Sequence, residues 1–494
     1  MLACCAACRC GGGAGPDGGG LSRTVDVTRQ RTFVTAAGRE DVAFDLIDSD
    51  VKLLITDDAG QRVIYPEVTG AGTGTFWGVP PGPFIVSLNG YNLETNEDDL
   101  DLGLANLGRS GATASDGGAV VLQLDVTGLQ PWQPFSDVLQ LTSENAGYVA
   151  LNAQAFVADQ PDAGVTDASF PIGYFSACGT RRGRYVPLID ADAGDVMTLT
   201  QLQSAPVGDA GLLELRTLVR AAVLPAFSMA DHALTQVPVA LAAPATMERL
   251  SLDFRQSAFD ALRSAVHPSA AAIASTVTVT ALPFTADLGA YTAAPDLAVL
   301  RPQQLSQDVS SSFDTGNPFP ASWPKLVSVR YTMQVAYDYP DGGTRALTTA
   351  MVTQDLLSAV GTAPLVPRVS PPRNIRVDGA DGLQRAQISR LPVLSWDPPA
   401  SGTPTSYGIS LFRFTRIGSG QIINVSEGAF FEVTGTSFRL PFGEVIPGGE
   451  YVFGVTAIAA PGASVARAPF KGGFPIGAAT ALTTMLHVDP TLMP

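Results

Sequence analysis

One stretch near the C-terminus constrains the fold more than any other: Pro447-Gly-Gly-Glu-Tyr451-Val-Phe453-Gly-Val455-Thr-Ala457. Every second residue from Tyr451 onward is apolar, and this period of two predicts a β-strand with one buried face. The Pro-Gly-Gly before it predicts a tight turn. A tyrosine that opens such a strand can bury its ring and hydrogen-bond its hydroxyl to the chain of the preceding corner. The stretch therefore predicts the entry corner of a β-sandwich.

Size and composition extend this prediction to the whole chain. A chain of 494 residues is too long for one core and is expected to form three or four domains of ~100–200 residues each. It contains 50 glycines and 37 prolines, and only 15% of its residues are charged, which favours short strands joined by turns. We expect a mainly β protein of several β-sandwich domains in series. One short amphipathic helix is predicted over residues 253–266, where Phe254, Phe259 and Val266 share a face.

The net charge excludes one class of partner. The chain carries a formal charge of −16 and a pI near 4.6, and a surface of that sign repels phosphate backbones, so no nucleic acid is expected. The one basic run, Arg181-Arg182-Gly183-Arg184, is interpreted as a solvated loop. No apolar stretch reaches the ~18 residues that a membrane-spanning helix needs, so the body of the protein is predicted to be soluble.

The first twenty residues combine a cysteine cluster, Met1–Cys10, with a flexible Gly-rich tether, Gly11–Gly20. The cluster resembles the end of a bacterial lipoprotein signal, which implies lipid attachment at Cys5 or Cys8 and a start codon upstream of Met1. An unprocessed tail is the alternative. A zinc site is disfavoured because four thiolates within seven residues leave no chain to wrap the metal. Cys178 is interpreted as a small buried residue.

Residues 21–125 predict a small β-sandwich. Val51–Ile55 and Val63–Tyr65 flank a turn and read as a hairpin. After them, Thr75–Leu88 contains an aromatic strand, the corner Val79-Pro-Pro-Gly82-Pro-Phe84 and a second alternating strand. This pattern resembles prealbumin-like or carboxypeptidase-regulatory-like domains, and the resemblance implies an accessory, non-catalytic module. The acidic run Glu94–Asp101 is interpreted as a solvated edge rather than a calcium loop.

Residues 126–365 predict a larger β-rich middle region, in one sandwich or two. Two of its features allow a functional interpretation as well as a structural one. Asp190-Ala-Asp192-Ala-Gly-Asp195 is interpreted as a turn, although its carboxylates could hold a hard cation. Trp323 is interpreted as a packing residue, although a sugar could stack on it. Five runs read as strands: Val138–Thr142, Met197–Leu202, Leu212–Val219, Thr276–Leu282 and Leu326–Val335.

Residues 366–494 carry the most specific pattern. After a Pro-rich linker come Asn374-Ile-Arg-Val377, Trp396-Asp-Pro-Pro399, Tyr407-Gly-Ile and the corner strand described above. In this order they resemble a fibronectin type III domain, which implies a β-sandwich. The long Pro/Gly-rich segment Ala459–Gly477 departs from the family. No Arg-Gly-Asp tripeptide is present, so binding to cell-adhesion receptors is not implied. The whole domain train resembles fibronectin type III-containing bacterial lipoproteins.

These features predict a non-catalytic exported or cell-envelope protein that acts as a binding or spacer module. We expect a monomer, possessing no cofactor or metal, with a protein or carbohydrate ligand and membrane contact only through an N-terminal lipid, at the outer membrane or outside the cell. The common catalytic motifs are absent from the sequence, which contains only three histidines. The alternative is a polysaccharide-active hydrolase with two acids in the middle region. It requires Asp190, Asp192, Asp195 and Trp323 to line one cleft.

Overall fold

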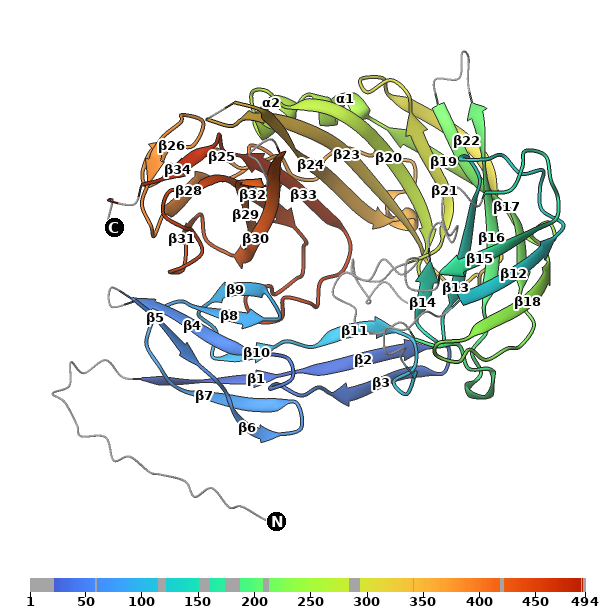
Figure 1. Ribbon diagram of the computed structural model, residues 1–494, viewed down its shortest axis with the longest axis horizontal. Coiled ribbons are helices and arrows are strands. Elements are labelled where there is room, and N and C mark those ends of the chain that lie inside the picture. The colour runs from blue at the N-terminus through green and yellow to red at the C-terminus, as the bar shows by residue number, and fades with distance from the viewer. Residues whose placement is uncertain are drawn as a thin grey trace, which may run out of the picture.

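The computed structural model describes residues 22–57, 60–113, 121–150, 160–173, 187–207, 213–283, 294–340, 342–417, 422–489 and 491. These residues form strands almost throughout, with three short α-helices among them. The expected mainly β fold of sandwiches in series is confirmed. The series also closes on itself, because the N-terminal strands lie beside the C-terminal ones in Figure 1.

The N-terminal unit is a sandwich with an attached three-stranded sheet. One sheet has the order β10-β1-β7-β6, and the facing sheet is built from the β4–β5 and β8–β9 hairpins, joined through β4 and β8. The predicted hairpin and aromatic strand are confirmed, and Phe76 and Val79 are fully buried in the core between the sheets. The third sheet has the order β11-β2-β3. The strands are β1 (Arg23–Thr28), β2 (Gln30–Thr35), β3 (Gly38–Ala43), β4 (Lys52–Asp57), β5 (Gly60–Ile64), β6 (Glu67–Gly70), β7 (Thr73–Val79), β8 (Phe84–Leu88), β9 (Tyr91–Thr95), β10 (Asp99–Asp101) and β11 (Leu104–Leu107).

The first half of the middle region has its own core around Trp132, which is 1% exposed and packs against Phe170. Its sheets are β15-β12-β18 and the antiparallel set β14, β13, β16 and β17. The elements are β12 (Val121–Thr127), β13 (Val138–Ser143), β14 (Tyr148–Ala150), β15 (Ala168–Gly173), the 3₁₀ helix η2 (Ala191–Ala193), β16 (Thr198–Val207), β17 (Leu213–Val223) and β18 (Leu234–Ala240).

The second half of the middle region shares strand β17 with the first half, because β17 pairs with both β16 and β21. The predicted helix is present but divided. Phe254 ends strand β19, and two short helices follow, with Phe259 and Val266 buried beneath them. The elements are β19 (Met247–Phe254), α1 (Gln256–Asp260), α2 (Arg263–Val266), β20 (Ala271–Ala281), β21 (Asp296–Pro302), β22 (Val309–Gly316), β23 (Lys325–Asp338), β24 (Thr344–Leu356) and α3 (Leu357–Val360). The domain boundaries at residues 125 and 365 stay predictions.

The C-terminal sandwich is fibronectin type III-like, as its motifs indicate. The chain enters one sheet at β25 and β28, crosses to β29 and β30, returns to β31 and crosses again to β32 and β33, which is a Greek-key order. Trp396 lies in the core, edge-on to Tyr407. The strands are β25 (Arg373–Val377), β26 (Ala380–Asp381), β27 (Gln387–Ile388), β28 (Val393–Asp397), β29 (Ser406–Ile417), β30 (Ile422–Val433), β31 (Ser437–Arg439), β32 (Glu450–Ala459), β33 (Ile476–Leu482) and β34 (Leu486–Val488).

The predicted tyrosine corner is also present. The Tyr451 ring is buried, and its hydroxyl accepts the Ile446 N–H at 2.9 Å. Tyr451→Phe keeps the ring but leaves this N–H without its acceptor, so we expect the free energy of unfolding to fall by about 1–2 kcal/mol. Urea denaturation measures the change. Tyr65→Phe is the control because Tyr65 is 64% exposed, and an equal loss in both variants would contradict the role of the corner.

Candidate functional site

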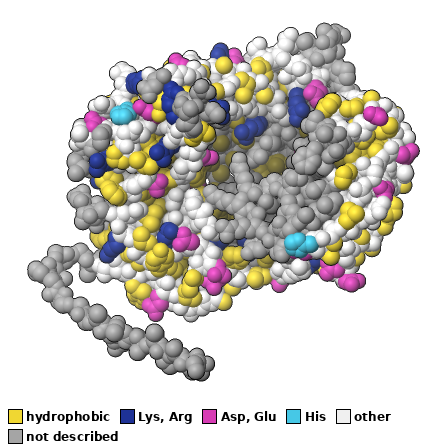
Figure 2. Space-filling model, in the orientation of Figure 1, with side chains coloured by type: hydrophobic (Ala, Val, Ile, Leu, Met, Phe, Trp, Pro, Cys, Tyr) yellow, Lys and Arg dark blue, Asp and Glu magenta, His cyan; other side chains and the backbone are white. Residues whose placement is uncertain are grey.

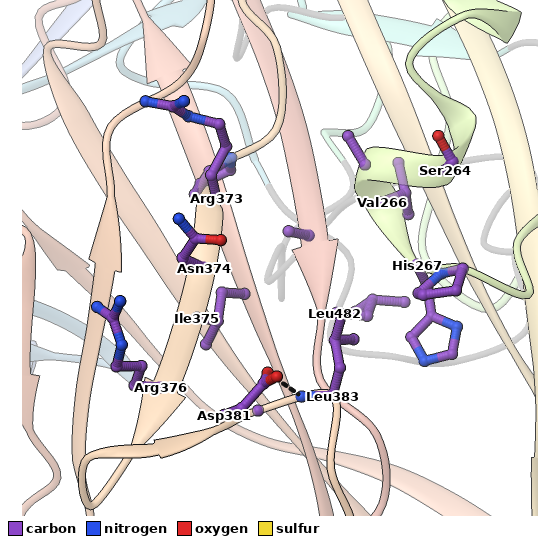
Figure 3. A pocket seen from close by; sticks show the side chains of 15 residues that line it. Ser264, Val266, His267, Arg373, Asn374, Ile375, Arg376, Asp381, Leu383 and Leu482 are labelled. Carbon is purple, nitrogen blue, oxygen red and sulfur yellow. Dashed lines mark hydrogen bonds between the residues drawn. The ribbon is translucent and has the colours of Figure 1, made fainter.

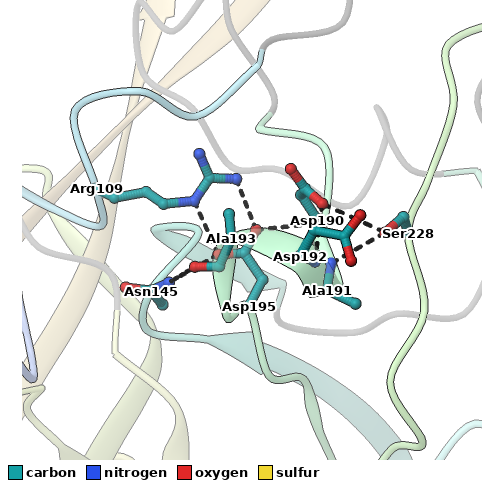
Figure 4. Close-up of polar contacts among 8 residues, drawn as sticks. All are labelled: Arg109, Asn145, Asp190, Ala191, Asp192, Ala193, Asp195 and Ser228. Carbon is teal, nitrogen blue, oxygen red and sulfur yellow. Dashed lines mark hydrogen bonds and ion pairs between the residues drawn. The ribbon is translucent and has the colours of Figure 1, made fainter.

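The loop that carries Asp190, Asp192 and Asp195 is a structural joint. Asp195 is buried, and its carboxylate accepts four hydrogen bonds of 2.9–3.0 Å, from Arg109 Nε and Nη2, Asn145 Nδ2 and the Asp190 N–H (Figure 4). The hydrogen bond to Asp195 raises the pKa of the Arg109 guanidinium. Because Arg109 follows the last strand of the N-terminal unit, this ion pair ties that unit to the middle region.

The backbone at this joint leaves no room for side chains. Gly147 has φ +75°, and a Cβ on it would lie 2.2 Å from the Leu107 carbonyl oxygen. Gly108 has φ +105°, and a Cβ there would lie 2.7 Å from Gly147 Cα. Only glycine fits at both positions. The joint therefore depends on close backbone contact as well as on the Arg109–Asp195 ion pair.

The remaining acids and Trp323 do not complete a cleft. Asp190 caps η2 by accepting the Asp192 N–H at 3.0 Å, and Asp192 is exposed, so the turn interpretation is confirmed. Trp323 is 4% exposed, stacks on Phe319 at 5.2 Å and belongs to the core of the second half of the middle region. It is a packing residue. In the part of the chain that the structure describes, no cluster of His, Cys, Asp and Glu could hold a metal ion.

Several residues singled out in the sequence lie outside the described ranges. These are the lipid-attachment candidates Cys5 and Cys8, together with Cys178 and the Arg181–Arg184 run. Lipid attachment therefore stays a prediction. None of the described helices has the length and hydrophobicity to cross a bilayer.

The candidate ligand site is a crevice of about 460 Å³ between helix α2 and the C-terminal sandwich (Figure 3). One wall is Ser264–Pro268, the other is Arg373–Arg376 with Asp381–Leu383, and strand β33 supplies Leu482. Crevices of this size at the contact between two domains are common ligand sites. The sequence carries no local signal for this one, because its walls come from segments more than a hundred residues apart.

The ionisable groups of the crevice are His267, Arg373, Arg376 and Asp381. Burial lowers the pKa of His267, which favours the neutral imidazole. The Arg373 and Arg376 guanidinium groups point away from His267 and Leu482 in Figure 3, and Arg373 Nε donates to the Pro398 carbonyl at 2.9 Å. Asp381 is the only acid among the lining residues. A glycosidase of the usual kind needs two.

A second contact joins the two ends of the chain, and we call it the closing interface: residues 91–101 against residues 430–432 and 463–471. Strands β9 and β30 pair in parallel, with Tyr91 opposite Phe430 and Leu93 opposite Glu432. The Tyr91 ring lies 4.8 Å from Phe470 and 6.1 Å from Phe430, centroid to centroid. Its hydroxyl donates to the buried Glu432 carboxylate, which also accepts from Ser406 Oγ at 2.5 Å. Aromatic packing and a buried carboxylate thus hold the two ends together.

The closing interface explains the segment that departs from the fibronectin type III pattern. Within Ala459–Gly477, Val465 is buried in the core of the N-terminal sandwich. Arg467 and Lys471 form ion pairs with Asp99 and Asp101, so the acidic run Glu94–Asp101 is not merely the solvated edge predicted from the sequence. Figure 2 shows acidic side chains scattered over this face of the molecule and not gathered into one patch.

Glu432 makes the closing interface sensitive to pH. Burial raises the pKa of its carboxyl group, while the hydrogen bonds from Ser406 and Tyr91 oppose that shift. The folded state therefore holds the proton more tightly than the unfolded state. Above the unfolded pKa of about 4.3, the contribution of Glu432 to the free energy of unfolding should fall as the pH rises through the folded pKa.

Glu432→Gln puts a neutral amide in place of the carboxyl group, so the variant should lose the pH-dependent contribution of Glu432 to the free energy of unfolding. We expect the free energy of unfolding of the variant minus that of the wild type to be larger at pH 7.5 than at pH 5, because the wild type loses the contribution of Glu432 as the pH rises. Urea denaturation across this pH range measures it, and taking the difference cancels the other titrating groups. A difference that stays constant with pH would contradict the role of Glu432.

No family model and no curated protein matches the chain. Among solved structures, it is similar to the chicken CNTN1 FN1-FN3 domains, with 8% identity over 78% of this chain and 97% of that chain at a TM-score of 0.16. It is also similar to a tetra-tandem repeat in the extending region of a large adhesion protein, with 12% identity over 94% and 100% of the two chains at a TM-score of 0.13. Scores this low support no argument about this chain.

Proposed function

We propose that the chain is a non-catalytic, exported cell-envelope protein that acts as a rigid binding or spacer module. The closing interface carries this proposal. Domains joined by short linkers usually move relative to one another unless a large apolar contact holds them. Here β24 pairs with β33 and β9 pairs with β30, in addition to the Arg109–Asp195 joint and the shared strand β17. Each unit therefore contacts two others, and these contacts hold the distances between the units constant.

The residues that the hydrolase alternative would need have structural roles. Asp195 uses both carboxylate oxygens in structural hydrogen bonds, Asp190 caps a helix, and Trp323 is buried. We expect the purified chain to release no reducing ends from polysaccharides. Release that Asp190→Asn or Asp195→Asn abolishes, while Asp381→Asn does not, would restore the alternative.

The crevice beside α2 is the proposed ligand site, for a neutral saccharide or a peptide. A glycan array with the full chain tests the carbohydrate class. Leu383 lines the crevice and is 48% exposed, so Leu383→Glu should abolish binding without disturbing the core. Leu234→Glu is the matched control, because Leu234 is 65% exposed on another unit. Glycan binding that survives Leu383→Glu would exclude the crevice, and a blank array would favour a protein ligand or a pure spacer.

Export and anchoring are tested separately. We propose a lipid on Cys5 or Cys8 and a monomeric protein at the outer membrane. Mass spectrometry of the native N-terminus should find a diacylglyceryl-modified cysteine, and Cys5→Ser with Cys8→Ser should release the protein from the membrane fraction. A free Met1 on a cytoplasmic protein would refute this part of the proposal. Light scattering measures the oligomeric state.

A further inference from the structure

Three side chains from separate segments of the middle region meet at one end of the β19–β22 pair. The Lys325 Nζ atom lies 3.0 Å from Glu248 Oε2, and Asn317 Nδ2 donates to Glu248 Oε1 at 2.9 Å. Glu248 is on β19, Asn317 directly follows β22, and Lys325 is the first residue of β23. One carboxylate therefore holds an amine on one oxygen and a carboxamide on the other.

Strand pairing fixes the positions of the three groups. In the β19–β22 ladder, Glu248 is opposite Thr315, two residues before Asn317. The Asn317 N–H donates to the Thr246 carbonyl at 3.0 Å, which keeps this residue beside β19. Lys325 belongs to β23, which pairs with β20 on one side and with β24 on the other. The amine, the carboxylate and the carboxamide are thus brought together by the backbone, which favours a reaction among them.

The carboxamide of Asn317 is polarised by a backbone donor. Asn317 is 6% exposed, and its Oδ1 atom accepts the Phe319 N–H at 3.0 Å. A donor at this oxygen draws electron density from the Cγ atom, and it can stabilise the negative charge that forms on the oxygen when a nucleophile adds to Cγ. The contact therefore prepares Cγ for attack.

The loop between Asn317 and Lys325 is apolar. Phe319 and Trp323 are buried and stack with their ring centroids 5.2 Å apart. Only 25% of the Lys325 side chain and 22% of the Glu248 side chain are exposed. A lysine amine becomes a nucleophile when a neighbouring base takes its proton. Glu248 is the base in contact with Nζ, so nucleophile, base and electrophile are all present.

We propose that Lys325 and Asn317 become joined by an amide bond between their side chains, with Glu248 as the proton carrier. Glu248 takes a proton from Nζ, the amine attacks Cγ, and the Phe319 N–H stabilises the charge on Oδ1. The Cγ–Nδ2 bond then breaks as the Nζ–Cγ bond is completed. Nζ gives up two protons in all, and Glu248 passes both to Nδ2, which leaves as an ammonium ion. The reaction runs once in each chain and needs no oxidant or reductant.

The residue after Asn317 blocks a competing reaction. An asparagine side chain can also lose ammonia when the backbone nitrogen of the next residue attacks its Cγ atom. Here the next residue is Pro318, whose nitrogen carries no hydrogen. Loss of ammonia at Asn317 therefore indicates attack by Lys325.

Mass spectrometry of tryptic peptides from the purified full chain tests the proposal. In the wild type we expect one peptide from Ser264 to Arg330, uncut after Lys325 and lighter than its sequence by one ammonia molecule. Trypsin does not cleave before Pro302, so Asn317 and Lys325 stay in this peptide. Lys325→Arg removes the nucleophile and Glu248→Gln removes the proton carrier. Both variants should be cleaved at position 325 and should keep their full mass.

The two other lysines of the chain supply the controls. Lys52 pairs with Asp50 and Lys471 with Asp101. Lys52→Arg should lose ammonia as the wild type does. In the urea-denatured wild type, N-hydroxysuccinimide acetate should acetylate Lys52 and Lys471 but not Lys325, whose nitrogen is already an amide.

The wild-type measurements decide the proposal even if a variant does not fold. A wild-type peptide of full mass, or acetylation of Lys325, would show an ion pair and a hydrogen bond only and would overturn the proposal. Ammonia loss that persists in Lys325→Arg would place the reaction elsewhere. Ammonia loss that persists in Glu248→Gln would overturn the role of Glu248. None of these results bears on the binding or spacer role, which rests on the closing interface.

Discussion

Asp195→Ala is expected to lower the free energy of unfolding of the middle region by about 3–5 kcal/mol, the usual cost of removing one partner from a buried ion pair. The Asp195 side chain is fully buried and that of Arg109 is 18% exposed. Removing the carboxylate leaves the guanidinium and the Asp190 N–H without this acceptor, and the Asn145 amide keeps only its hydrogen bond to the Ala193 carbonyl. The joint between the first two units should loosen together with the loop.

Native-state hydrogen exchange of strands β13 and β16 measures this loss, since these strands contribute Leu139, Leu141 and Leu199 to the core beside the joint. Asp192→Ala is the matched control, because Asp192 is an exposed carboxylate of the same loop and should change the free energy of unfolding by less than about 0.5 kcal/mol. If the two variants were equally stable, Asp195 would not be the structural residue of this loop.

Tyr91→Ala is expected to open the closing interface at a cost of about 3–5 kcal/mol, the range for removing a large buried aromatic side chain. Tyr91 is 8% exposed, contacts Phe470 and Phe430, and donates to Glu432. The ion pairs of Arg467 and Lys471 cannot replace it, because these side chains are more than half exposed and such pairs are worth about 0–1 kcal/mol each.

Small-angle X-ray scattering should show a larger radius of gyration for Tyr91→Ala, and hydrogen exchange should increase in β9 and β30. Tyr65→Ala is the control, since Tyr65 is 64% exposed on the same unit. Tyr91→Phe should give an intermediate effect, because it removes the hydrogen bond to Glu432 and keeps the ring. Unchanged scattering and unchanged exchange in Tyr91→Ala would mean that the interface does not hold the ends together.

Local patterns were sufficient for the strands that were named from the sequence and for the Tyr451 corner. Alternation of apolar residues reports which face of a strand is buried, and it does so without knowledge of the partner. The helix over 253–266 shows the limit of this method. The apolar spacing of Phe254, Phe259 and Val266 fits one helix, but Phe254 pairs with Val309 in a β-ladder, and that long-range pairing determines where the helix begins.

By itself, the sequence determined a mainly β chain of sandwiches, a fibronectin type III-like C-terminal unit and an acidic surface, because these follow from short-range periodicity, turn residues and composition. Only the tertiary structure shows which contacts Ala459–Gly477 and Glu94–Asp101 make and which hydrogen bonds Asp195 accepts. Each of these depends on contacts between residues far apart in the chain, such as Tyr91 with Glu432 or Arg109 with Asp195. A charged or aromatic residue looks the same in sequence whether it is solvated or buried against a distant partner, and the free energy that separates the two cases comes from that partner.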